Sequence, residues 1–169
     1  MQVLKSQSVK ILFSLLLLPS ILTGIYSYRP DLRYKCIRVL DGDTVILKRG
    51  SQSLRVRLSF IDAPEKSQYS FDKVPIGLES KLFLEKLILN KTVKLKNFGK
   101  DLYSRTIGEI FYQNYSINEL MVTQGMAISF MNNKKIRFNI AEYKAKIQRK
   151  GIWKTSGFYE PKKYRKMFK

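Results

Sequence analysis

Residues 36–65, CIRVLDGDTVILKRGSQSLRVRLSFIDAPE, decide how this chain folds. They contain three runs of strand-forming residues, at residues 36–40, 44–47 and 54–61. Asp-Gly-Asp at residues 41–43 is a tight-turn signal between the first two runs, and Arg-Gly-Ser at residues 49–51 is a second one. Pro64 cannot continue a hydrogen-bonded ladder, so the third run ends before it. The stretch therefore predicts a three-stranded meander.

Strand and helix signals alternate after this meander. Helices are predicted at residues 77–90, 116–125 and 139–150, and two further strands at residues 92–96 and 107–112. Ser116 and Glu119 form a capping box at the start of the second helix. Five strands with interposed helices predict a β-barrel with helices in the α+β class, namely a five-stranded OB-fold barrel with three helices.

The chain has 169 residues, 32 Lys and Arg against 13 Asp and Glu, and a formal net charge of +19. This excess favours a polyanionic partner, either a nucleic acid or an anionic membrane surface. Lysine supplies 22 of the basic residues, and a compositional bias toward lysine would explain part of the excess without any partner. The C-terminal segment, residues 134–169, is the most basic part and interleaves its charges with aromatic residues. It is either a solvated surface or a non-specific phosphate-binding strip.

The chain contains no histidine. This excludes Ser-His-Asp and Cys-His catalysis and zinc sites with histidine ligands. Any reaction must use carboxylates, arginines, lysines, tyrosines, hydroxyls or a metal held by oxygen. The single cysteine, Cys36, cannot form an internal disulfide, and its place in a strand predicts a small buried side chain.

The amino-terminal residues predict export. Lys5 and Lys10 precede an apolar run of 15 residues at 11–25, a length typical of a signal-peptide core and short of the ~20 residues that span a bilayer. We expect residues 1–27 to be a signal peptide or an uncleaved membrane anchor, and residues 28–169 to form a single domain. The protein would then be secreted, periplasmic or anchored at the cell membrane.

Charged residues gather at strand ends and in loops, where catalytic sites are common. Asp43 and Asp62 can share one hard cation through oxygen ligands. Arg57 and Arg105 can fork onto a phosphate group, and Glu65 can orient or deprotonate a water molecule. Alone, each has an ordinary explanation: a hairpin turn, a salt bridge or a loop carboxylate. Together they predict metal-assisted hydrolysis of a phosphodiester.

The chain resembles the staphylococcal nuclease (thermonuclease) family over about residues 34–153. The matching segments, in the family's order, are VLDGDT at 39–44, Arg57 with DAPE at 62–65, GLES at 77–80, D-x-Y-x-R at 101–105, QGMA at 124–127 and GIW at 151–153. Each segment alone is a weak signal, whereas the ordered set is specific to the family.

The resemblance implies a role for each matching residue. Asp43 and Asp62 would bind one calcium ion, with the Ala63 carbonyl and water molecules completing its coordination. Glu65 would act on the attacking water, either as general base or by orienting it.

The resemblance also implies how substrate is held. Arg57 and Arg105 would bind the scissile phosphate and stabilise the transition state, and Tyr103 would line the nucleotide pocket. Where the family commonly carries Trp or Tyr after the QGMA segment, this chain has Phe130, which can still stack on a base. Leu102 stands where the family usually has a basic residue.

The implied activity is a calcium-dependent endonuclease and exonuclease that cuts DNA and RNA without sequence preference and leaves 3′-phosphate ends. The protein is expected to act as a monomer. A nuclease-like OB-fold module that binds nucleic acid or a protein partner without cutting is the alternative. A basic protein that coats anionic membranes is a weaker third, because it leaves the gathered carboxylates unexplained.

Overall fold

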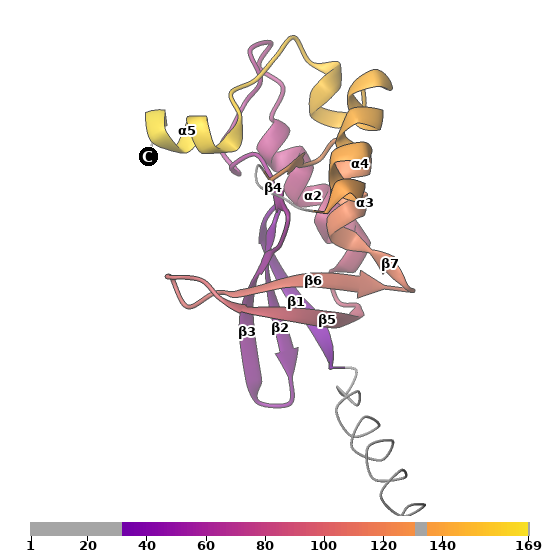
Figure 1. Cartoon of the computed structure of the whole chain (residues 1–169). Coiled ribbons are helices and arrows are strands. Elements are labelled where there is room, and N and C mark those ends of the chain that lie inside the picture. The colour runs from indigo at the N-terminus through magenta and orange to yellow at the C-terminus, as the bar shows by residue number, and fades with distance from the viewer. Residues whose placement is uncertain (1–31, 131–134, 169) are drawn as a thin grey trace, which may run out of the picture. The chain divides into compact units, whose positions relative to one another are not determined.

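The computed structural model describes residues 32–130 and 135–168 of the chain (Figure 1). The predicted leader, residues 1–27, lies outside the described residues. Within the described residues, no helix is both long and apolar enough to cross a membrane.

Five long strands form a closed barrel: β1 (Arg33–Asp41), β2 (Thr44–Arg49), β3 (Gln52–Leu58), β5 (Thr92–Lys100) and β6 (Thr106–Tyr112). Neighbours pair antiparallel in the order β3-β2-β1-β5-β6, and a parallel pairing of β3 with β6 closes the barrel. The predicted OB-fold barrel is confirmed. Among the short strands, β7 (Tyr115–Ser116) pairs with β6, and β4 (Ile61–Asp62) pairs with β8 (Ile128–Ser129) in a separate two-stranded sheet.

The third strand ends earlier than predicted. The run at residues 54–61 is interrupted after Leu58, and Phe60 adopts a left-handed backbone conformation with φ of 70°. A β ladder cannot include such a residue, so the chain bends at this point. The bend brings Asp62 back to β3, where Nη2 of Arg57 donates a hydrogen bond to Oδ1 of Asp62 at 2.7 Å.

The described residues form four α-helices: α2 (Ile76–Ile88), α3 (Ile117–Thr123), α4 (Ile136–Ile147) and α5 (Pro161–Phe168). The first three confirm the predicted helices, although α4 begins and ends three residues earlier than predicted. Ser116 Oγ accepts the Glu119 N–H as the capping box requires. The fourth helix, α5, was not predicted, because its sequence PKKYRKMF is short and rich in basic residues, and only Pro161 is buried. Pro161 occupies the first turn, where proline costs no hydrogen bond.

The core fills the barrel and continues under α2 and α3. Its fully buried members include Cys36, as predicted, together with Val45, Leu47, Val56, Leu84, Ile88, Ile110 and Met121. In Figure 1, α2, α3 and α4 gather at one end of the barrel, and α5 lies apart from α3 and α4. The β1–β2 turn and the chain after β4 meet at this end.

Candidate active site

Asp43 lies in the two-residue turn between β1 and β2, directly after Gly42. The Asp43 N–H donates to Oδ1 of Asp41 at 3.1 Å, and Thr44 Oγ1 donates to Oδ1 of Asp43 at 3.1 Å. The second carboxylate oxygen, Oδ2, accepts the Ala63 N–H at 2.8 Å. The turn therefore buries the Asp43 carboxylate against the segment that follows β4.

Two glycines allow α2 to pack closely against the turn that carries Asp43 and the loop that carries Glu65. A Cβ atom on Gly42 would lie 2.0 Å from Ser80 Oγ of α2, and one on Gly77 of α2 would lie 1.7 Å from the Glu65 carbonyl oxygen. Neither separation is sterically possible, so only glycine permits these approaches. The helix thus fixes the turn that carries Asp43 and the loop that carries Glu65.

Arg57 of β3 joins Asp43 to Asp62. Its guanidinium forms ion pairs with both carboxylates, and the three side chains are 15%, 8% and 3% exposed. Burial raises the pKa of Asp43 to about 6, against the opposing charge of Arg57. Desolvation lowers the pKa of Arg57, but the carboxylates of Asp43 and Asp62 outweigh it and raise that pKa above its ordinary value. One arginine thus forms ion pairs with both buried carboxylates.

Arg105 is held by a different carboxylate, that of Asp101 in the loop before β6. Arg105 Nε donates to Oδ2 of Asp101 at 2.7 Å, while Oδ1 accepts the N–H groups of Tyr103 at 3.0 Å and Arg105 at 2.9 Å. The guanidinium also lies over the Tyr103 ring, 5.5 Å from its centroid. The D-x-Y-x-R segment is therefore a self-contained turn that orients its own arginine.

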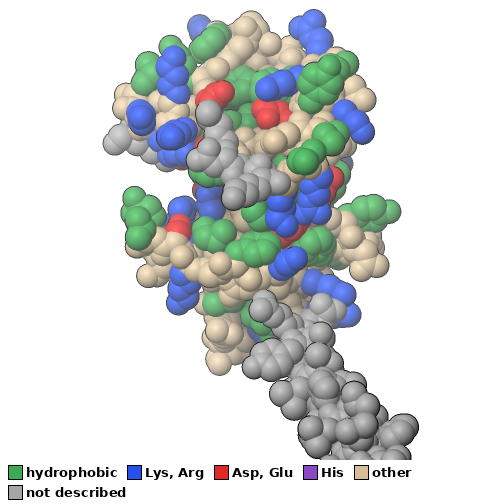
Figure 2. Space-filling view, viewed as in Figure 1, with side chains coloured by type: hydrophobic (Ala, Val, Ile, Leu, Met, Phe, Trp, Pro, Cys, Tyr) green, Lys and Arg blue, Asp and Glu red, His purple; other side chains and the backbone are tan. Residues whose placement is uncertain are grey.

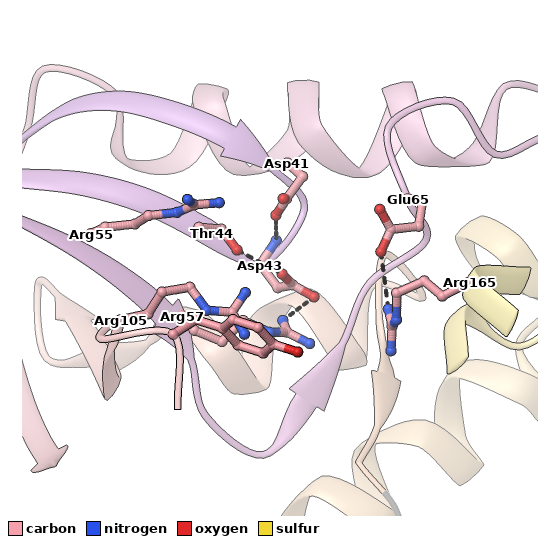
Figure 3. A pocket seen from close by; sticks show the side chains of 9 residues that line it. Asp41, Asp43, Thr44, Arg55, Arg57, Glu65, Arg105 and Arg165 are labelled. Atoms are coloured by element: carbon pink, nitrogen blue, oxygen red, sulfur yellow. Dashed lines mark hydrogen bonds and ion pairs between the residues drawn. The ribbon is translucent and has the colours of Figure 1, made fainter. Parts of the chain in front are cut away.

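These elements surround a cavity of about 470 Å³ (Figure 3). It is lined by Asp41, Asp43, Thr44, Arg55, Arg57, Glu65, Tyr103, Arg105 and Arg165. The structure thus brings together Asp43, Arg57, Glu65, Tyr103 and Arg105 as the sequence predicts. Asp62 and Ala63 do not line the cavity, although they are bonded to Arg57 and Asp43 at its edge.

Phe130 lies in a neighbouring cavity of about 400 Å³ rather than in this one. The two cavities share Arg57, Arg105 and Arg165 as lining residues. Phe130 is 48% exposed, and Tyr103 is 80% exposed. Both predicted stacking residues are therefore accessible to solvent, each in a cavity that the same three arginines line.

Four lining residues were not among the predicted site residues. Asp41 and Thr44 belong to the VLDGDT segment. Arg55 lies on the same face of β3 as Arg57, and this spacing was the signal that could have identified it. Arg165 of α5 had no such signal, since it is 103 residues away from Asp62 in a lysine-rich tail. Its Nη2 donates to Oδ2 of Asp62 at 2.8 Å and its Nη1 to Oε1 of Glu65 at 3.0 Å.

The donor atoms available at this site are oxygens. Within residues 32–130 and 135–168, no cluster of three or more Asp, Glu or Cys side chains is arranged to hold a metal ion. Asp43 and Asp62 form a smaller set, two buried carboxylates linked by Arg57. Carboxylates supplemented by backbone carbonyls and water suit a hard cation such as calcium. The residues present fit that class of ion.

Comparison with known proteins identifies the family. The sequence model described as "Staphylococcal nuclease homologue" matches residues 55–155, which include Arg57, Asp62, Glu65 and Arg105. The chain belongs to the staphylococcal nuclease family. The sequence resemblance is thereby confirmed, and the barrel with its turn at Asp43 is the family's OB-fold domain.

Several relatives align with most of this chain. A protein named "Uncharacterized endonuclease" from Haemophilus influenzae is 35% identical over 94% of this chain and 86% of its own length. A "Micrococcal nuclease" from Shigella flexneri is 32% identical over 82% of this chain and 83% of its own. An "Uncharacterized endonuclease" from Escherichia coli O157:H7 is 31% identical over 73% and 78%.

Proposed function

We propose that this protein is a nuclease that hydrolyses phosphodiester bonds in DNA and RNA with one calcium ion. The observation that carries the proposal is the buried Asp43–Arg57–Asp62 cluster at the edge of a cavity that also receives Glu65 and Arg105. Family membership and relatives named as endonucleases support the same chemistry. The enzyme acts within chains and at their ends and leaves 3′-phosphate products.

Asp43 and Asp62 hold the calcium ion, which when bound supplies positive charge to the phosphate. Arg57 and Arg105 bind the non-bridging phosphate oxygens and neutralise the charge that develops in the transition state. Both remain protonated at every working pH, so neither donates a proton to the leaving group. Glu65 orients the attacking water or removes its proton, since the chain has no histidine to do so.

Substrate capture relies on charge and stacking rather than on base edges. Figure 2 shows Lys and Arg side chains spread over the face it presents, with few acidic groups between them. Phosphate contacts of this kind fix the position of a nucleic acid but do not read its sequence. The exposed rings of Tyr103 and Phe130 stack on bases of any kind. We therefore expect cleavage without sequence preference.

Digestion of labelled single- and double-stranded DNA and RNA, with calcium or with a chelator, tests the proposal. We expect cleavage only with calcium, 3′-phosphate ends, and a loss of at least about 100-fold in kcat for Glu65→Gln. Glu79→Gln in the first turn of α2, a partly buried carboxylate that does not line the cavity, is the matched control and should keep full activity. Binding of nucleic acid without any cleavage would favour the alternative of a non-catalytic module.

We also propose that residues 1–27 direct the domain out of the cytoplasm, where it acts as a monomer. Fractionation of cells that express the full chain, with mass spectrometry of the mature N-terminus, distinguishes a cleaved signal from a retained anchor. Recovery of uncleaved protein only in the cytoplasm would contradict export.

A further inference from the structure

The guanidinium of Arg165 bridges two carboxylates of the active site. Its Nη1 bonds to Oε1 of Glu65 at 3.0 Å and to Oδ1 of Asp62 at 3.2 Å, and its Nη2 bonds to Oδ2 of Asp62 at 2.8 Å. Figure 3 shows this side chain reaching from α5 toward Glu65 at the rim of the cavity. Such forked contacts define the separation and the orientation of both carboxylates.

Specific contacts hold α5 in this place. Gln68 is fully buried; its Nε2 donates to the Tyr159 carbonyl at 2.6 Å, and its Oε1 accepts the Glu65 N–H at 3.2 Å. The Tyr159 ring packs edge-on against Phe71 with centroids 5.1 Å apart. One buried amide thus ties the segment that leads into α5 to the backbone of Glu65. The position of Arg165 relative to Glu65 is built into the fold.

The charge balance explains why a cation is needed there. Asp43 and Asp62 share Arg57, and Glu65 adds a further negative charge at the same rim. The positive charge of Arg165 offsets the repulsion between the carboxylates of Glu65 and Asp62. The bonds and charges of both carboxylates outweigh desolvation and raise the pKa of Arg165, so its positive charge is permanent.

We propose that Arg165 is a positioning residue of the nuclease: it holds the Glu65 carboxylate beside Asp62, where Glu65 acts on the attacking water. This inference rests on the proposed function. Arg165 acts through Glu65, so it affects the chemical step more than substrate binding. A competing role, in which the guanidinium occupies the cation site and keeps the enzyme inactive, predicts the opposite change in activity.

The test compares the 169-residue protein with Arg165→Gln and Arg165→Lys at saturating calcium. We expect Arg165→Gln to lower kcat by about 10- to 100-fold with KM within about 2-fold, because misplacement of a catalytic group slows chemistry. The kcat of Arg165→Lys should lie between those of the wild type and Arg165→Gln, since an ammonium keeps the charge but cannot fork onto two carboxylates. Lys166→Gln removes the same charge from the exposed face of α5 and should leave kcat unchanged.

Two further measurements separate positioning from a general structural role. In a Glu65→Gln background, Arg165→Gln should have no further effect on kcat, because the residue through which it acts is already lost. Calcium titration calorimetry without substrate should show that Arg165→Gln binds calcium at least as tightly as the wild type, since a nearby positive charge is gone. The kcat loss then does not arise from lost metal.

Several outcomes would overturn the inference. Equal kcat for Arg165→Gln and wild type would do so, as would an undiminished effect in the Glu65→Gln background. Tighter calcium binding together with faster cleavage would assign Arg165 the competing, inhibitory role instead. A wild-type protein that does not cut in calcium refutes the proposed function as well. Cutting by the wild type with no effect of Arg165→Gln refutes this inference alone.

Discussion

Besides the turn that carries Tyr103 and Arg105, the active site has two walls that are built in different ways. The first wall, residues 41–65, comes from one continuous stretch, and its charged groups Asp43, Arg57 and Asp62 are buried and bonded to one another. The second wall, α5, brings a single arginine that is 34% exposed, about a hundred residues later in the chain. Register between strands positions the first wall, whereas side-chain contacts position the second. We therefore expect mutations in the first wall to cost both fold and function, and those in the second to cost function alone.

The largest effect is expected for Asp43→Asn in the first wall. The amide removes a proposed calcium ligand, so activity should fall by about 10³-fold and calcium should no longer raise the melting temperature. Digestion assays and thermal melts with and without calcium measure both effects. Glu142→Gln, which removes a carboxylate from α4 outside the cavity, should change neither. A calcium-dependent rise in melting temperature that survives in Asp43→Asn would contradict the assignment.

A smaller effect on activity, but a larger contrast in stability, is expected between Arg57→Gln and Arg105→Gln. Both should lose about 10²-fold in kcat as phosphate-binding groups are removed. Only Arg57→Gln removes the ion-pair partner of the buried Asp43 carboxylate and one of the two partners of Asp62, which costs about 3–5 kcal/mol of unfolding free energy. The Arg105 pair with Asp101 is more exposed and contributes about 1 kcal/mol or less. Chemical denaturation measures the difference. Equal losses of unfolding free energy in the two variants would contradict the expected contrast between a buried and a more exposed arginine.

Most of the first wall could be predicted from the sequence because it is local. Turn signals, period-two runs and the proline after β4 placed Asp43, Arg57, Asp62 and Glu65 at one end of a barrel. The break at Phe60 could not be predicted, since its left-handed backbone depends on the pairing of β4 with β8, nearly seventy residues further along the chain. No local sequence pattern indicates a pairing between two-residue strands so far apart in the chain.

The second wall could not be predicted because nothing in α5 distinguishes one basic residue from the next. Lys162, Lys163, Arg165 and Lys166 are all basic residues of one short helix. Contacts made in the folded chain, such as those of Gln68 with Tyr159 and of Tyr164 with Ser67, decide which of these cations faces Asp62. Long-range side-chain contacts of this kind have no periodicity for sequence reasoning to detect.

The close contact between α2 and the Glu65 loop should not tolerate an added methyl group at Gly77. Gly77→Ala places a Cβ atom 1.7 Å from the Glu65 carbonyl oxygen, so the loop must move. We expect a loss of about 1–3 kcal/mol in unfolding free energy and a lower kcat as Glu65 shifts. Gly50→Asn is the control: it lies in open space at φ of 57°, which asparagine tolerates. Unchanged kcat in Gly77→Ala would show that the loop position does not govern Glu65.

The smallest effect concerns the barrel beneath both walls. Burial raises the pKa of the Cys36 thiol from 9.0 to about 11. Between these two values the unfolded thiol has lost its proton while the folded thiol keeps it, so the unfolding free energy falls as pH rises through this window and then levels off. The part that belongs to Cys36 should be about 2 kcal/mol by pH 11. Denaturation of wild type and Cys36→Ala from pH 8 to 11 isolates it, because all other groups titrate alike in both. If the unfolding free energies of the two proteins change in parallel with pH, then the Cys36 thiol in β1 is open to solvent. The barrel that supports the first wall would then be less tightly packed than its burial indicates.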